Sequence, residues 1–153
     1  MPTHSPTIGT ISHATLRPQD LIPAFRDAIC AINTGDYDEA LSHLFTILPA
    51  TDDDPWWNSE EAQDFINTMS DILNDHAPPY LYFGAHVGDG SDFGFWPDHD
   101  QIRDDIHDGT LLKVNDTSEI PPNHPTPVLH VNDYGNMTLY VPTTTHTELW
   151  SIV

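Results

Sequence analysis

The spacing of apolar residues changes at Pro78-Pro79, and this change constrains the fold more than any other feature of the sequence. Before these prolines, apolar residues recur every three to four positions, which is the period of a helix. After them, apolar and polar residues alternate, as they do in half-buried strands. Helices followed by strands are typical of an α+β fold with an antiparallel sheet. We therefore expect about three N-terminal helices packed on a C-terminal antiparallel sheet of five to six strands.

Three helical patterns lie in the helical part, residues 18–77. The first runs from Pro18 to just before Gly35, and we expect its Cys30 on the buried face. The second opens with Asp36 and Glu39 as a capping box and ends at Pro49. The third has the clearest apolar stripe, and we expect Asn58 with Glu61 to cap it. Its stripe consists of Ala62, Phe65, Ile66, Met69, Ile72 and Leu73.

The sheet part, residues 80–153, contains six candidate strands at 80–87, 92–96, 110–114, 127–132, 137–141 and 147–153. The first two form a predicted β-hairpin, with residues 88–91 (Gly-Asp-Gly-Ser) as a turn that uses the positive φ angles open to glycine. Residues 1–17 are expected to be a flexible arm or an edge strand, and 18–153 a single α+β domain. The aromatic side chains of Tyr80, Tyr82 and Trp96 on the other face of this hairpin predict a second contact surface or a homodimer interface.

The charge excludes several classes of partner. The 24 acidic residues face only four Lys and Arg, which gives a net charge of −20. Such a chain repels phosphate backbones and anionic lipids, so we expect no direct binding of nucleic acid or membranes. A basic protein surface is the expected partner. One cysteine, no signal peptide and no membrane span predict a cytoplasmic location in the host cell.

Most of this charge lies in one stretch, because −14 of the −20 falls within residues 51–108. A rigid row of carboxylates can imitate the charges of nucleic acid and occupy a cationic groove built to hold it. The sequence therefore predicts a non-enzymatic inhibitor, without cofactor or catalytic residues, that binds such a groove. The predicted contact residues are Asp52, Asp53, Asp54, Glu60, Glu61, Asp64, Asp71, Asp75, Asp98, Asp100, Asp104, Asp105 and Asp108.

Other interpretations of the same acidic residues stay open. The charge could serve solubility alone, or adaptation to high salt. A small metal-dependent enzyme could use the histidines and aspartates of residues 86–108, since these side chains are ligands for Mg²⁺, Mn²⁺ or Zn²⁺. Its ligands would be His86, Asp89, Asp92, His99 and His107. An immunity or antitoxin protein against a basic nuclease would use the same electrostatics as the inhibitor.

Residues 82–96, Tyr-Phe-Gly-Ala-His-x-Gly-Asp-Gly-x-Asp-Phe-Gly-Phe-Trp, resemble a stretch in small acidic proteins encoded by phages and other mobile elements. Residues 131–140 and 149–153 strengthen this resemblance, which covers about the C-terminal half. The resemblance implies a genetic setting and carries no catalytic residues. By analogy, small acidic phage proteins include anti-CRISPR and anti-restriction factors that mimic DNA, so the resemblance implies a counter-defence role.

Overall fold

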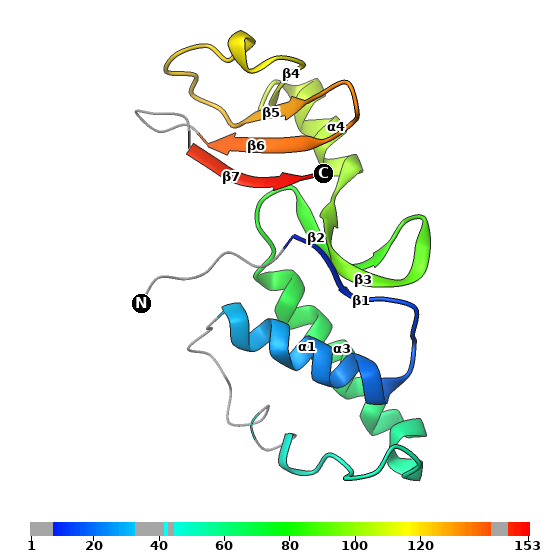
Figure 1. Cartoon of the computed structure of the whole chain (residues 1–153). Coiled ribbons are helices and arrows are strands. Elements are labelled where there is room, and N and C mark those ends of the chain that lie inside the picture. The colour runs from blue at the N-terminus through cyan, green and yellow to red at the C-terminus, as the bar shows by residue number, and fades with distance from the viewer. Residues whose placement is uncertain (1–7, 33–41, 43–44, 142–146) are drawn as a thin grey trace. The chain divides into compact units, whose positions relative to one another are not determined.

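The computed structural model describes residues 8–32, 42, 45–141 and 147–153. They contain three α-helices and seven strands, which group into two compact units (Figure 1). Unit 1 comprises the described residues of 1–77 and 82–96, and unit 2 comprises 78–81 and those of 97–153.

Unit 1 packs two helices on a three-stranded sheet. The helices α1 (Pro18–Ile32) and α3 (Glu60–Asp75) lie side by side (Figure 1), and the 3-10 helix η1 (Pro55–Asn58) precedes α3. The strands are β1 (Gly9–Ser12), β2 (Leu81–His86) and β3 (Asp89–Pro97), in the sheet order β1-β3-β2. The N-terminal strand β1 therefore forms one edge of a sheet whose other two strands come from a hairpin more than 60 residues later.

Aromatic rings form the centre of the unit 1 core. Phe25 of α1 meets Phe83 of β2 edge-on at 5.1 Å and Phe93 of β3 at 5.7 Å between ring centroids. Phe83 also contacts Phe95 at 5.2 Å. Edge-to-face pairs at these distances stabilise a core beyond the burial of their area. The alternation of residues in the hairpin thus directs one aromatic face against α1.

Unit 2 combines one helix with a four-stranded sheet. The helix is α4 (His99–Asp108), and the 3-10 helix η2 (Thr117–Glu119) lies in the loop after the first strand. The strands β4 (Leu112–Val114), β5 (Val128–Val131), β6 (Met137–Val141) and β7 (Thr147–Ile152) follow their chain order in the sheet. The last strand is tied to the start of the unit, because Trp150 Nε1 donates a hydrogen bond to the Pro79 carbonyl at 2.9 Å.

The predicted α+β class is confirmed, but the predicted single antiparallel sheet of five to six strands is wrong. Two separate sheets form, and β4 pairs with β5 in parallel while the other unit 2 pairs are antiparallel. A parallel pair requires a long crossover connection, which residues 115–127 supply. In chain order, α4 follows directly after the last strand of the first sheet and precedes the first strand of the second.

Several local predictions need correction. The hairpin turn consists of Val87 and Gly88 instead of the predicted residues 88–91, and neither residue has a positive φ angle. Cys30 lies on the exposed side of α1 instead of the core. The side chain that caps α3 is Ser59, not Asn58, because its Oγ accepts a hydrogen bond from the Ala62 N–H. The predicted helix opening at Asp36 lies largely outside the described residues.

Candidate functional site

The exposed face of α3 carries a row of four carboxylates. Glu60, Asp64, Asp71 and Asp75 are spaced four, seven and four residues apart, so they lie along one side of the helix. All four are exposed, and none forms a side-chain hydrogen bond or ion pair with another described residue. Fifteen residues of helix rise about 22 Å, which is the length of the row. We call these four residues the α3 acidic row.

The opposite face of α3 holds the row in place. Its buried residues are Ala62, Phe65, Ile66, Met69 and Leu73, of which Ala62, Met69 and Leu73 are completely shielded from solvent. Since a helix buried along one face cannot rotate about its axis, the carboxylates on the other face keep a fixed direction. The row is therefore a rigid feature of unit 1.

The charges at the two ends of α3 have opposite effects on the helix. Glu60 and Glu61 lie in the first turn, where the helix dipole favours negative charge. Asp75 lies in the last turn, where the dipole disfavours an anion, and α3 contains no Lys or Arg. The carboxylates at the C-terminal end therefore do not stabilise the helix that carries them.

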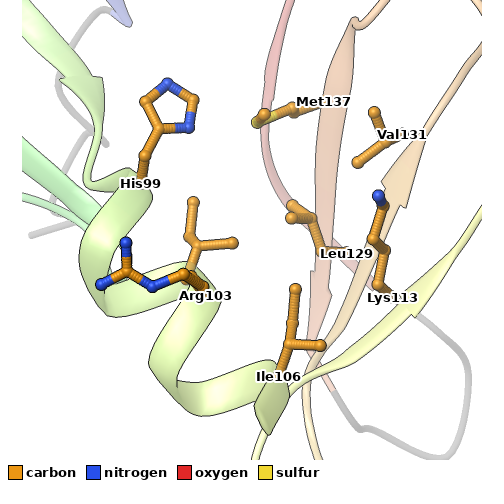
Figure 2. Close-up of a pocket in the computed structure, with 8 residues that line it drawn as sticks. His99, Arg103, Ile106, Lys113, Leu129, Val131 and Met137 are labelled. Carbon is orange, nitrogen blue, oxygen red and sulfur yellow. The ribbon is translucent and has the colours of Figure 1, made fainter.

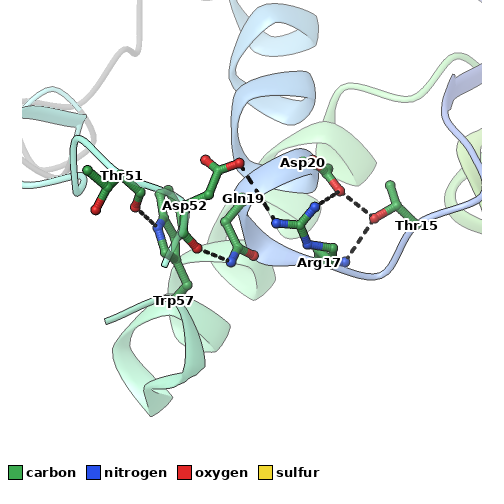
Figure 3. A network of polar contacts seen from close by, with 7 residues as sticks. All are labelled: Thr15, Arg17, Gln19, Asp20, Thr51, Asp52 and Trp57. Carbon is green, nitrogen blue, oxygen red and sulfur yellow. Dashed lines mark hydrogen bonds and ion pairs between the residues drawn. The ribbon is translucent and has the colours of Figure 1, made fainter. Parts of the chain in front are cut away.

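A hydrogen-bond network fixes the segment before α3 to the start of α1 (Figure 3). Gln19 Nε2 donates to the Asp52 carbonyl at 2.8 Å, and Trp57 Nε1 donates to the Thr51 carbonyl at 2.9 Å. The Arg17 guanidinium lies 3.8 Å from the Asp52 carboxylate and 3.7 Å from that of Asp20. Asp52 therefore has a cationic neighbour and is less available to a partner than the α3 acidic row.

The remaining predicted residues of unit 1 differ in availability. Asp53 is exposed, whereas the half-buried Asp54 caps η1 by accepting a hydrogen bond from the Trp56 N–H at 2.8 Å. Glu61 accepts a hydrogen bond from Trp56 Nε1 at 3.0 Å. Asp54 and Glu61 thus have structural partners on neighbouring elements.

A cavity of about 350 Å³ lies beside the first turn of α3. Leu16, which is 64% exposed, and Trp57 supply apolar walls, and Glu60 supplies a carboxylate. Pro18, Asn58, Ser59 and Gln63 complete the lining. A cationic side chain with an aliphatic stem would match this combination of apolar walls and negative charge. Leu16 was not predicted as a site residue, although it is an isolated apolar residue in a polar segment of the sequence.

The second acidic group lies on α4 in unit 2, and several of its carboxylates have partners. Asp98 caps the helix by accepting a hydrogen bond from the Gln101 N–H at 3.1 Å. Arg103 forms ion pairs with Asp100 at 2.9 Å and Asp104 at 3.2 Å, and both carboxylates raise the pKa of its guanidinium. Only Asp108 of this group is exposed without such a partner among the described residues.

Asp105 of the same helix faces a buried tyrosine. The pKa of Tyr80 is raised to about 12, mainly because the side chain is buried. A hydrogen bond to Asp105 and the negative charge of that carboxylate raise it further. Asp105 is itself half-buried. The thirteen predicted contact residues therefore form two groups, one in each unit, and the unpaired exposed carboxylates are concentrated on α3.

The five residues of the metal alternative are divided between the two units. His86 Nδ1 accepts a hydrogen bond from the Gly88 N–H at 3.0 Å, and its ring meets Trp96 edge-on at 4.7 Å. Asp89 accepts hydrogen bonds from the Ser91 N–H and hydroxyl, which lower the pKa of Asp89. Asp92 Oδ1 is buried without a hydrogen-bond partner in the described structure. His99 and His107 belong to α4 in unit 2.

Within the described ranges, no group of three or more His, Cys, Asp or Glu side chains is placed to hold one metal ion. No helix in those ranges has the length and apolar content needed to cross a membrane. Comparison with protein-family models, with curated proteins and with solved structures gave no match.

Proposed function

We propose that this chain is a non-enzymatic acidic inhibitor that binds a cationic, nucleic-acid-binding surface of another protein. The observation that carries the proposal is the α3 acidic row: four exposed, unpaired carboxylates aligned on the face opposite a buried apolar stripe. Charged residues that serve solubility alone need not be aligned, and the helix dipole disfavours the negative charge of Asp75 at the C-terminal end of α3. The row therefore suits recognition better than solubility or helix stability.

The row contains one charge per roughly 7 Å of helix, whereas duplex DNA contains one per about 1.7 Å. It can therefore replace only part of the phosphates in a groove, and further contacts must supply the remaining affinity. The cavity beside Glu60 is suited to this, because it can accept an Arg or Lys side chain next to the row. A partner with cationic side chains spaced along a groove is the expected target, and a host defence complex is the class that we favour.

The test uses two matched triple variants. The row variant is Asp64→Lys, Asp71→Lys and Asp75→Lys, which leaves the favourable Glu60 in place. The control variant is Glu119→Lys, Asp133→Lys and Glu148→Lys, three exposed residues of unit 2. Both change the net charge by the same amount, so any difference between them reports position instead of total charge.

Partners are captured from host lysate at low and high salt and identified. Their affinities for the natural protein, the row variant and the control variant are then measured with and without competing DNA. We expect nucleic-acid-binding proteins, displacement by DNA, and affinity lost in the row variant but largely kept in the control. Capture of a nuclease toxin would place the same contact in an immunity protein. Equal losses in the two variants, or no competition by DNA, would contradict the proposal.

A further inference from the structure

A cavity of about 360 Å³ lies between α4 and one face of the unit 2 sheet (Figure 2). Its apolar lining comes from both sides, and consists of Ile102, Ile106, Leu129, Val131 and Met137. Ile102 and Leu129 are buried, whereas Ile106, Val131 and Met137 are only half-buried. Apolar atoms in this groove are therefore accessible to a ligand.

The other three lining residues are His99, Arg103 and Lys113. The whole chain has only four Lys and Arg and ten His among 153 residues, yet these types supply three of the eight residues of the groove. None of the acidic residues in the described ranges lines it, although the chain contains 24. The groove is thus a local exception to the charge of the molecule.

The cations of the groove differ in what they can offer to a ligand. The Arg103 guanidinium points away from the sheet in Figure 2 and is held by Asp100 and Asp104, so its aliphatic stem forms the wall. Lys113 on β4 is exposed, and its ammonium group has no ion pair with another described residue. Lys113 is also paired in register with Leu129, which places a cation beside the apolar wall.

We propose that this groove binds a small carboxylate with an apolar body. The ligand carboxylate pairs with the Lys113 ammonium, with His99 of α4 as a second donor, and the apolar body covers the half-buried Val131 and Met137. The volume lies at the lower end of the range for small-molecule sites, which suits a ligand of this size and is too small for a partner helix. Distant carboxylates oppose an anion only weakly, since charges beyond about 8–10 Å are screened at physiological salt.

The test is an NMR titration of the full chain with octanoate and, as the neutral probe of equal length, 1-octanol. We expect octanoate to shift the methyl signals of Leu129, Val131 and Met137 and to bind about fivefold more tightly than 1-octanol. Lys113→Gln should abolish this preference. Arg17→Gln, which removes one positive charge from unit 1, should leave it unchanged.

Three results would overturn the proposal. The first is equal affinity for the two probes in the natural protein, and the second is an equal effect of Lys113→Gln and Arg17→Gln. The third is concentration-dependent self-association that shifts the same methyl signals and excludes octanoate, because the groove would then be covered by a second copy of the chain. The proposal is independent of the inhibitor function, since neither probe involves the α3 acidic row.

Discussion

Tyr80 occupies a position in which its backbone and its side chain are both constrained. Its φ angle of 66° is in the left-handed region that side chains disfavour, and only 8% of the residue is exposed. Its carbonyl accepts a hydrogen bond from the Asp98 N–H at 2.8 Å, while its hydroxyl contacts Asp105. A strained backbone persists where the surroundings determine it, and here Asp98 at the N-cap of α4 and Asp105 in the second half of that helix do so.

The raised pKa of Tyr80, about 12, predicts a loss of stability in alkali. An unfolded tyrosine releases its proton near pH 10, whereas folded Tyr80 keeps its proton to about pH 12. The unfolded state therefore gains stability as the pH rises from 10 to 12, and unfolding becomes easier in that window. Denaturant unfolding at several pH values should show this loss, and Tyr80→Phe should remove it. Tyr134→Phe is the control because Tyr134 is 90% exposed, and a loss unaffected by Tyr80→Phe would contradict the assignment.

Gly94 is required by the close approach of β1 to β3. A Cβ at this position would overlap the backbone carbonyl of Gly9, which is fixed by strand pairing. We expect Gly94→Ala to lower the free energy of unfolding by about 2 kcal/mol or more, because backbone cannot move aside cheaply. Gly90→Ala in the same strand should cost little, since nothing lies within 4 Å of its added Cβ. Thermal melts of both variants measure the difference. Equal melting temperatures would contradict the prediction, because they would show that β1 moves away from β3 at little cost.

Among the helices and strands, α3 links the sequence to the proposed site most directly. Its apolar stripe predicted both the helix and the direction of its carboxylates. The structure buries five of the six stripe residues and leaves Ile72 half-buried. The cap was misplaced by one residue because Asn58 and Ser59 are both good capping residues. Only the backbone path after η1 decides between them.

The corrected cap gives a direct test. Ser59→Ala should reduce the free energy of unfolding by about 1 kcal/mol, because the Ala62 N–H loses its acceptor. Asn58→Ala should have a smaller effect, since Asn58 does not cap α3. Urea unfolding curves of the two variants provide the comparison. A larger loss for Asn58→Ala would restore the cap expected from the sequence.

The strands of unit 2 were predicted from alternation to within a few residues, but the division into two sheets was not. Period-two spacing identifies a strand without naming its neighbour, and pairing depends on contacts far apart in the sequence. The pairing of β1 with β3 and the parallel pairing of β4 with β5 are both of this kind. The groove was missed for the same reason, since only the fold brings Lys113 and His99 to the lining of one cavity.

The net charge of −20 affects the stability of the entire protein. Self-repulsion among like charges destabilises a compact state, and salt screens it. The carboxylates of the α3 acidic row contribute to this repulsion, because no described cation pairs with them. Stability should therefore depend on ionic strength even without any partner.

We expect the melting temperature to rise by several degrees between about 0.01 M and 0.5 M NaCl, where the screening length falls from roughly 30 Å to below 10 Å. Most of the gain should occur below about 0.2 M. The variant with Glu119, Asp133 and Glu148 changed to Lys should gain less, because it starts with weaker repulsion. Scanning calorimetry across salt provides the measurement. Folding only in molar salt would instead favour adaptation to a saline cell.

The pairing of β1 with β3 also bears on the order of events during synthesis. Gly9 of β1 finds its partner Phe95 only after more than 80 further residues have left the ribosome. Until then the first strand is an unpaired edge, and α1 lacks the aromatic rings of the hairpin against which Phe25 packs. Unit 1 must therefore complete its fold late and cooperatively, and a nascent chain stalled before the hairpin would be a target for chaperones or proteases.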